Sequence, residues 1–550
     1  MLDVLVVGAG PHALILATLL LNPQQHVSSS NVEILQGLQL SKTNSKTGRT
    51  KSQRRSVGTR SELHKDLERP PCPLLNFKVV DSYGEWASLW ESQFTALNIP
   101  HLRSHMLVHT NPLNKKALQE FVLAKARVAE LHSLPERVYI LDKNAFFNDG
   151  RLGKQNRKLL SAAQGLQTNL YFSLPGTQLS VDFFKEQVCS YNLDRIIMKG
   201  TVDRIAPILS KKQNKVEFFR VTLDTGEIIE AKKVVLATGP TREQMANIPP
   251  WVSAISENYP EESLQHTVKL MHFMSQHKDK GNCVTGPPAV CHRSQRVMVI
   301  GGGLTSAHII FMALQQGANQ VTWVLRKHVQ LKQFDVGDVE SLIGRYSHIE
   351  HGIKLDGLAY LRQFYGERSL HRRLAMIKQA RKGGAVTPEA YAQLQPFIQS
   401  GQLLVKAYCQ VTEAMWCYEA QRWKVFLCDG EKWTGDRIWL ATGCKLDVNQ
   451  DPLLSDIKED FPIQVLEGWP CISETLRWAP GCPVYLMGQY AALQVGPHAV
   501  NLAGGQAAAF RIARDIIDEH GSEELHKETT KVEKARTEEY ISHMHGLMWL

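Results

Sequence analysis

Two short glycine turns are the residues of this chain best suited to chemistry. The first, near the start of the chain, is Gly8-Ala9-Gly10-Pro11-His12-Ala13 and has the pattern GxGxxA. In such a turn the first glycine permits a tight bend, and the second lets the backbone approach a pyrophosphate. The third small residue allows a helix to pack closely on a strand. The candidate dinucleotide-binding residues here are Gly8, Gly10, Pro11 and Ala13.

The second turn lies beyond the middle of the chain and repeats this arrangement as Gly301-Gly302-Gly303-Leu304-Thr305-Ser306. Both turns follow an apolar run that is typical of a buried parallel strand and precede an apolar helical segment. The candidate residues in the second turn are Gly301, Gly303, Thr305 and Ser306. Two complete turns indicate two bound dinucleotides, one of them a flavin.

Charged residues at the ends of the following strands indicate which dinucleotide each unit takes. Asp81 ends the second strand of the first unit, where an acid accepts hydrogen bonds from ribose hydroxyls. The corresponding strand of the second unit ends in Arg326 and Lys327. Cations at this point suit a 2′-phosphate, which an acid would repel, so NADPH is favoured over NADH. The alternative for Asp81 is a strand-end carboxylate in a turn, and the alternative for Arg326 and Lys327 is a solvated strand end.

Two strands end in Ala-Thr-Gly, which lets the backbone and a small hydroxyl lie close to a cofactor. These strand ends add Thr238, Gly239, Thr442 and Gly443 to the candidates, and Gly488 follows a short strand before a glycine-rich entry into a long helix. The N-terminus of that helix could direct its positive dipole at a reduced flavin ring. No acid or base stands out as catalytic, so no catalytic residue is assigned, and no metal site is expected.

The elements that position these residues predict an α/β fold with two Rossmann-like dinucleotide-binding domains, one for FAD and one for NADPH. The FAD-binding domain is discontinuous and comprises residues 1–245 and 441–520, with the NADPH-binding domain at 265–440 between them. Residues 22–73 are polar and basic without a hydrophobic period and predict a mobile insertion. Residues 521–550 form a charged tail.

Two other stretches carry no motif. Lys115 to Leu131 has the pattern of one amphipathic helix, and Asp335 to Ala390 is predicted to be mainly helical.

Composition limits the class of protein. The 550 residues suit two or three domains, and 43% hydrophobic with 21% charged residues is typical of a soluble globular protein. A net charge of +9 is mild, and no nucleic-acid motif is present, so nucleic-acid binding is not expected. No membrane span or leader is predicted. The ten cysteines form no CxxC pair, which favours reduced thiols in the cytoplasm over a zinc ribbon or a dithiol reductase.

The order of these motifs resembles the flavin-dependent monooxygenases with two dinucleotide-binding domains, and among them the lysine and ornithine N-hydroxylases. The element from Asp436 to Gly443, D-x3-LATG, is typical of N-hydroxylases. There are departures: Leu304-Thr305-Ser306 replaces the usual Gln-Ser-Ala. The flavin monooxygenase fingerprint FxGxxxHS is not intact, and His266 is either its remnant or an ordinary surface histidine.

The resemblance implies an FAD-containing, NADPH-dependent monooxygenase. Such an enzyme would N-hydroxylate a primary amine, such as lysine or ornithine, through a C4a-hydroperoxyflavin formed with O₂. Association into a homo-oligomer, frequent among such proteins, is left open. Two alternatives stand beside this interpretation: an NAD(P)H-dependent flavin oxidoreductase that passes electrons to a quinone or a protein, and a non-enzymatic, redox-responsive flavoprotein.

Overall fold

The computed structural model describes residues 1–23, 75–132, 138–140, 173–210, 215–239, 245–276, 289–332, 346–350, 353–354, 357–381 and 384–522. Apart from residues 22–23 and 521–522, the predicted insertion and the predicted tail lie outside these ranges. None of the helices within these ranges is long and apolar enough to cross a membrane.

The first sheet has eight strands around β1. Five run parallel in the order β25-β9-β1-β2-β6, and β24, β7 and β8 add antiparallel pairs. The strands are β1 (Leu2–Val7), β2 (Phe77–Asp81), β6 (Ile197–Lys199), β7 (Val202–Leu209), β8 (Val216–Leu223), β9 (Ile228–Leu236), β24 (Arg477–Ala479) and β25 (Cys482–Leu486). Because β25 pairs with β9, a late segment of the chain completes the sheet that the first residues begin.

The second sheet has five strands, all parallel, in the order β10-β21-β11-β12-β17. They are β10 (Leu264–His266), β11 (Arg296–Ile300), β12 (Gln320–Val324), β17 (Leu403–Lys406) and β21 (Arg437–Leu440). Alternate side chains enter two different cores: Val297 and Val299 pack among helices, whereas Met298 packs against a three-stranded antiparallel sheet. That small sheet is β18 (Val411–Cys417), β19 (Arg422–Leu427) and β20 (Lys432–Gly435).

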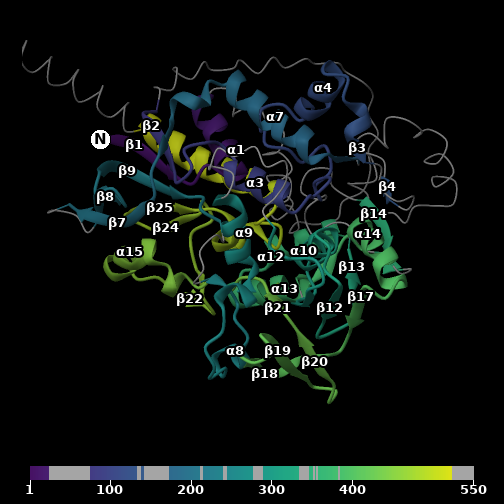
Figure 1. The fold of residues 1–550 in the computed structure, drawn as a ribbon. Helices are drawn as coiled ribbons and strands as arrows, with labels where there is room; N and C mark the ends of the chain where they lie inside the picture. The colour runs from purple at the N-terminus through teal and green to yellow at the C-terminus, as the bar shows by residue number, and fades with distance from the viewer. Residues whose placement is uncertain are drawn as a thin grey trace, which may run out of the picture.

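Helices cover both sheets (Figure 1). In the first unit they are α1 (Pro11–Leu21), α3 (Ser88–Ala96), α4 (Ala117–Ala124), α7 (Thr177–Ser190) and a C-terminal helix over 502–522. In the second they are α9 (Thr267–Gln276), α10 (Leu304–Gln315) and α14 (Pro388–Gln399). Residues 13–20 of α1 are buried on every side, as expected for a helix that is apolar all round. Figure 1 shows the yellow C-terminal helix beside α1.

Each unit sends helices into the core of the other. Ala96 and Leu97, at the end of α3, belong to the core of the second unit. In return, α12 (Gly357–Gly366) and α13 (Leu370–Ala380), which lie between strands of the second sheet in the chain, place Phe364 and Leu374 in the core of the first. The two units therefore brace each other.

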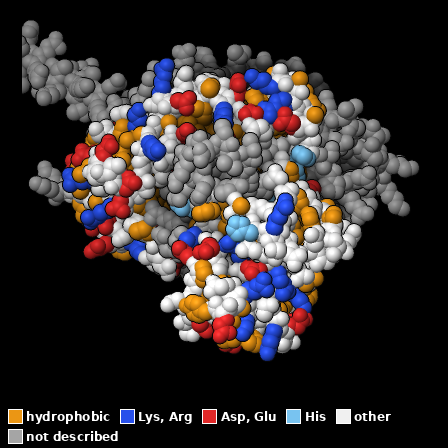
Figure 2. Space-filling view, in the orientation of Figure 1, with side chains coloured by type: hydrophobic (Ala, Val, Ile, Leu, Met, Phe, Trp, Pro, Cys, Tyr) orange, Lys and Arg blue, Asp and Glu red, His pale blue; other side chains and the backbone are white. Residues whose placement is uncertain are grey.

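The other described strands and α-helices are short. They are β3 (Leu131–His132), β4 (Val138–Ile140), β5 (Leu174–Pro175), β13 (Gln330–Leu331), β14 (Tyr346–Glu350), β15 (Ile353–Lys354), β16 (Ala385–Val386), β22 (Val465–Leu466), β23 (Trp469–Pro470), α8 (Pro250–Ser253), α15 (Ser455–Asp460) and α16 (Ala492–Val495). Acidic and basic side chains are mixed over the face in Figure 2, and Lys and Arg gather on its lower lobe, where Figure 1 places β18, β19 and β20.

The predicted fold class is confirmed. The chain forms two parallel-sheet units, each with a strand–glycine turn–helix element, and the first unit is assembled from two separated segments. The exact residue boundaries predicted for the domains stay a prediction.

Candidate functional site

The first glycine turn is built so that each glycine has a separate task. Gly8 has a φ of +97°, and a Cβ at this residue would lie 2.7 Å from the carbonyl oxygen of Ala237. No larger residue fits there without moving the strand end that crosses the turn. At Gly10 a Cβ would meet none of the described residues within 4 Å, so this side of the turn is open with respect to them. Open space over the second glycine is what a closely approaching pyrophosphate requires.

The helix after this turn offers unsatisfied donors to that open space. α1 begins at Pro11, directly after Gly10, and no side chain among the described residues caps its N-terminus. Its first N–H groups and its dipole therefore favour an anion. Ala13 is fully buried and packs the helix against the sheet, as its place in the motif predicts.

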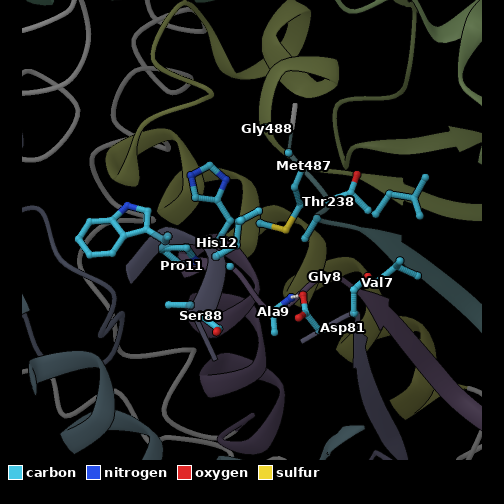
Figure 3. A pocket seen from close by; sticks show the side chains of 18 of the residues that line it. Val7, Gly8, Ala9, Pro11, His12, Asp81, Ser88, Thr238, Met487 and Gly488 are labelled. Carbon is cyan, nitrogen blue, oxygen red and sulfur yellow. Dashed lines mark hydrogen bonds between the residues drawn. The ribbon is translucent and has the colours of Figure 1, made fainter. Parts of the chain in front are cut away.

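Asp81 ties the end of β2 to the turn. One carboxylate oxygen accepts a hydrogen bond from the Ala9 amide at 2.9 Å, and the other accepts one from the Tyr83 amide at 2.9 Å. Figure 3 shows Ala9 and the Asp81 carboxylate facing each other. The carboxylate is thus held in a fixed orientation at the wall of a cavity. Binding of ribose hydroxyls by this group stays a prediction.

A cavity of about 780 Å³ joins the first turn to the end of the first sheet. Its volume lies within the usual range of small-molecule and cofactor sites. Seven of the predicted site residues line it: Gly8, Gly10, Pro11, Asp81, Thr238, Gly239 and Gly488. The chain thus brings together residues from both ends of its sequence, and Figure 3 shows Thr238 and Gly488 across the cavity from Pro11.

His12 also lines the cavity and was not among the predicted residues. Its Nε2 donates to the carbonyl oxygen of Asn501 at 3.0 Å, and burial lowers its pKa to about 4. A Cβ at Gly505 would lie 2.3 Å from the His12 ring, so this glycine lets the C-terminal helix pack on the imidazole. The adjacent glycines of the terminal helix were a signal of close packing, although the sequence does not show its partner.

Two further features of the lining were not among the predicted site residues. The rings of Trp90 and Phe94 on α3 stack with centroids 3.8 Å apart and give the cavity an apolar wall. Arg103 places a guanidinium at the same cavity and donates from Nη2 to the carbonyl oxygen of Lys332 at 3.1 Å. Lys332 belongs to the second unit, so Arg103 spans from the cavity to that unit. No motif in the sequence marks these positions.

The second glycine turn has the same construction as the first. Gly301 has a φ of +140°, and its Cβ would lie 2.1 Å from the carbonyl oxygen of Ala441. At Gly303, which precedes α10, a Cβ would meet no atom of the described part of the chain within 4 Å, and no side chain of that part caps the helix. Ser306 is fully buried at the position that Ala13 occupies in the first turn, and Thr305 is exposed.

The two Ala-Thr-Gly strand ends cross the two turns in equivalent ways. The Ala237 amide donates a hydrogen bond to the carbonyl oxygen of Val7 at 2.9 Å. In the second unit, the Ala441 amide donates to the carbonyl oxygen of Ile300 at 2.8 Å. Gly239 and Gly443 both take positive φ values, +65° and +78°. The strand end that closes each turn therefore belongs to the same structural unit as the turn.

His266 holds the second Ala-Thr-Gly strand end, which crosses the second glycine turn, in place. Its side chain is buried; Nε2 donates to the carbonyl oxygen of Gly443 at 3.1 Å, and Nδ1 accepts from the Val268 amide at 3.2 Å. Burial lowers its pKa, in keeping with a neutral ring that uses both nitrogens. The interpretation as an ordinary surface histidine is wrong. Thr442 is held similarly, since its hydroxyl donates to the carbonyl oxygen of Asn247 at 2.6 Å.

The end of β12 differs from the end of β2. The Gly8 amide donates to the carbonyl oxygen of Val80, and the Gly301 amide donates to the carbonyl oxygen of Val324. Val80 and Val324 are therefore equivalent positions. Leu325, which follows Val324, takes the place of Asp81. Arg326 and Lys327 follow, and both are exposed. The carboxyl edge of the second sheet thus carries the other predicted residues: Gly301, Gly303, Thr305, Ser306, Arg326, Lys327, Thr442 and Gly443.

Comparisons with known proteins agree with this construction. Residues 189–340 match the family model of L-lysine 6-monooxygenase/L-ornithine 5-monooxygenase. The fold is similar to ornithine hydroxylase from Pseudomonas aeruginosa and to L-lysine 6-monooxygenase from Pseudomonas syringae. For each, sequence identity is 15% and the TM-score 0.57, over 94% of this chain and 99% of the other. No curated protein matches the chain. The predicted resemblance is confirmed, in sequence over 189–340 and in fold over most of the chain.

Proposed function

We propose that this protein is an FAD-containing, NADPH-dependent monooxygenase that N-hydroxylates a primary amine of a small molecule. One observation carries the proposal. Two equivalent glycine turns, each crossed by its own Ala-Thr-Gly strand end, lie in units that brace each other. The match of residues 189–340, which contain one crossing and the second turn, supports the N-hydroxylating class.

FAD fits the first site. The open face of Gly10 and the uncapped start of α1 would receive its pyrophosphate, and Asp81 would accept from its ribose. Gly488 and Asn501 would lie at the other end of the cavity, beside the start of the C-terminal helix. NADPH fits the second turn in the same way, with Arg326 and Lys327 for the 2′-phosphate. When bound, the two groups supply the electrons and the activation of O₂.

The residues of the cavity suit a neutral amine. An amine attacks oxygen only through its free electron pair, so its uncharged form must be favoured. The Arg103 guanidinium at the cavity disfavours a second cation nearby, and the stacked Trp90 and Phe94 rings help to exclude water. A cytosolic location and the choice of lysine or ornithine as the amine belong to this proposal.

The test is a product assay with FAD-loaded protein, NADPH and O₂ on lysine, ornithine and other primary amines. We expect a hydroxylated amine whose formation requires both NADPH and O₂. A hydroxylated product at background level with every amine would contradict the proposal. Rapid anaerobic NADPH oxidation with a quinone would then indicate a reductase, and no turnover with any acceptor would indicate a non-enzymatic flavoprotein.

A further inference from the structure

Tyr408 is an exposed aromatic residue in an unusual backbone conformation. Its side chain is 70% exposed, and its φ is +56°, in the left-handed region that non-glycine residues rarely adopt. Such a conformation costs on the order of 1–3 kcal/mol, and an exposed ring gains little from packing in return. A strained position of this kind is more common at ligand sites than elsewhere.

The loop that carries Tyr408 is fixed to the end of β12. β17 and β12 are neighbouring parallel strands, so their carboxyl ends meet at one edge of the sheet (Figure 1). The Cys409 amide donates to the carbonyl oxygen of Leu325 at 2.8 Å. The Tyr408 hydroxyl lies 3.1 Å from Nδ1 of His328, and the two rings are 6.1 Å apart. The ring is therefore held in place although it faces solvent.

Two cations follow Leu325, the residue to which this loop is hydrogen-bonded. Arg326 and Lys327 follow Leu325 directly, are exposed, and pair with no carboxylate among the residues that the structure describes. By contrast, Lys406, which precedes the same loop, is paired with Glu431 at 2.5 Å. An exposed aromatic ring and two exposed cations at one edge of a sheet are a combination that suits a base and a phosphate on one ligand.

We propose that Tyr408 is the platform on which the adenine of the nicotinamide dinucleotide stacks, and that His328 positions this ring. Arg326 and Lys327 receive the 2′-phosphate next to it. The inference rests on the NADPH dependence proposed above and deepens it, because it assigns adenine and phosphate recognition to different residues. Tyr408 then contributes to binding of any adenine dinucleotide, whereas Arg326 distinguishes NADPH from NADH.

Calorimetric titration of the FAD-loaded full chain with 2′,5′-ADP and with 5′-AMP separates the two roles without requiring turnover. Tyr408→Asn removes the ring but tolerates a left-handed backbone, and Tyr408→Phe keeps the ring. Arg326→Ala removes one cation. Tyr418→Asn is the matched control, since Tyr418 is a 56% exposed tyrosine elsewhere on the second unit.

The wild-type protein should bind 2′,5′-ADP more tightly than 5′-AMP. Tyr408→Asn should weaken both ligands by the same factor, roughly tenfold for one stacked base, and Tyr408→Phe by less than about twofold. Arg326→Ala should instead remove most of the preference for 2′,5′-ADP. His328→Ala should weaken both ligands by the same factor, but by less than Tyr408→Asn does. His328→Gln can still form a hydrogen bond with the Tyr408 hydroxyl, so it should recover most of the lost affinity.

Wild-type affinity for both ligands in Tyr408→Asn would overturn the platform. So would an equal loss in Tyr418→Asn, or a wild-type protein that does not bind 2′,5′-ADP at all. The outcome for the proposed function is separate. If the ligands bind as expected but no amine is hydroxylated, the nucleotide site stands and the monooxygenase proposal fails.

Discussion

Four glycines determine where the two cofactors that we propose could approach the backbone. Gly8 and Gly301 have positive φ values and no room for a Cβ, whereas Gly10 and Gly303 have open space where a Cβ would be. The first kind of glycine shapes the turn, and the second kind exposes it. Substitutions at the two kinds should therefore differ: the first should affect folding, and the second should affect ligand binding.

Gly10→Ala and Gly303→Ala test this division. Each places a methyl group in open space, so the fold should persist, but the methyl group occupies the side from which a pyrophosphate would approach. We expect Gly10→Ala to lower FAD affinity and Gly303→Ala to raise the KM for NADPH, each roughly 10- to 100-fold. Measured FAD content and NADPH kinetics check this.

Gly366→Ala is the matched control, because a Cβ there also meets nothing within 4 Å but lies at the end of α12. It should leave both cofactors unaffected. Equal effects of Gly10→Ala on FAD and on NADPH would show that the two turns do not hold separate ligands.

At this scale the sequence shows glycine spacing well, because the turn itself demands glycine. It does not show which distant residue fills the space around a side chain. His12 was missed as a lining residue for this reason, since its partner Asn501 lies at the other end of the chain. His266 could not be placed either, because its hydrogen-bond partner, the Gly443 carbonyl oxygen, is 177 residues away in the chain.

Among the elements, the C-terminal helix depends on a polar network that anchors it to the first sheet. The fully buried Tyr485 on β25 donates to Asp515 at 2.7 Å, and Arg477 reaches Glu519 at 2.5 Å and the Tyr485 hydroxyl at 3.2 Å. The same helix begins at the cavity, beside His12. Weakening this polar network should therefore lower the free energy of unfolding and also affect ligand binding at the cavity.

Tyr485→Phe removes the central hydroxyl and leaves two charged groups without it. We expect the free energy of unfolding to fall by about 1–3 kcal/mol and FAD to dissociate faster. Urea unfolding and the rate of FAD release measure the two effects. Tyr191→Phe, which removes a hydroxyl that contacts Asn111 at 3.2 Å on the same unit, is the comparison. A stability loss no larger than in that variant would argue against the anchor.

Elements with long apolar runs were predictable because burial on both faces leaves a continuous hydrophobic signal, as in β1, α1 and β11. Other elements depend on tertiary contacts. The helix expected from Lys115 to Leu131 is limited to Ala117–Ala124, because the chain turns at Ala126, which has a φ of +54°. The stretch from Asp335 to Ala390 includes α12 and α13, but nothing in it shows that they pack on the other unit.

The two units of the molecule are held together because each contributes side chains to the other. Arg373 on α13 is buried and donates to the carbonyl oxygen of Leu493 at 3.1 Å and to Gln494 at 2.9 Å. Arg103 reaches in the opposite direction, to Lys332. With core side chains also exchanged, these contacts favour a fixed relation between the two glycine turns rather than free rotation of the units.

Stability of the whole chain should depend on pH through buried histidines in both units. Burial lowers the pKa of His109 and of His308 from 6.5 to about 4. The folded protein therefore binds these protons more weakly than the unfolded chain does. Their contribution is complete above about pH 6.5 and is lost as the pH falls towards 4, by roughly 1.4 kcal/mol per pH unit for each histidine.

Urea unfolding at pH 7.5, 6 and 5 measures this dependence. His109 donates to the Lys115 carbonyl and accepts from the Asn111 amide, and a glutamine can make both hydrogen bonds without titrating. His109→Gln should therefore lose stability less steeply on acidification than the wild-type protein. An unchanged slope in this variant would mean that His109 does not contribute to the pH dependence.

The most direct measurement is the anaerobic reduction of the bound flavin by NADPH, followed in a stopped-flow spectrometer. It asks whether the two glycine turns hold two dinucleotides that react with each other. The structure leads us to expect rapid loss of the oxidised flavin absorbance with NADPH, much slower loss with NADH, and a weakened response in Gly303→Ala. Flavin that stays oxidised with NADPH in the FAD-loaded wild-type protein would contradict a paired arrangement of the two sites.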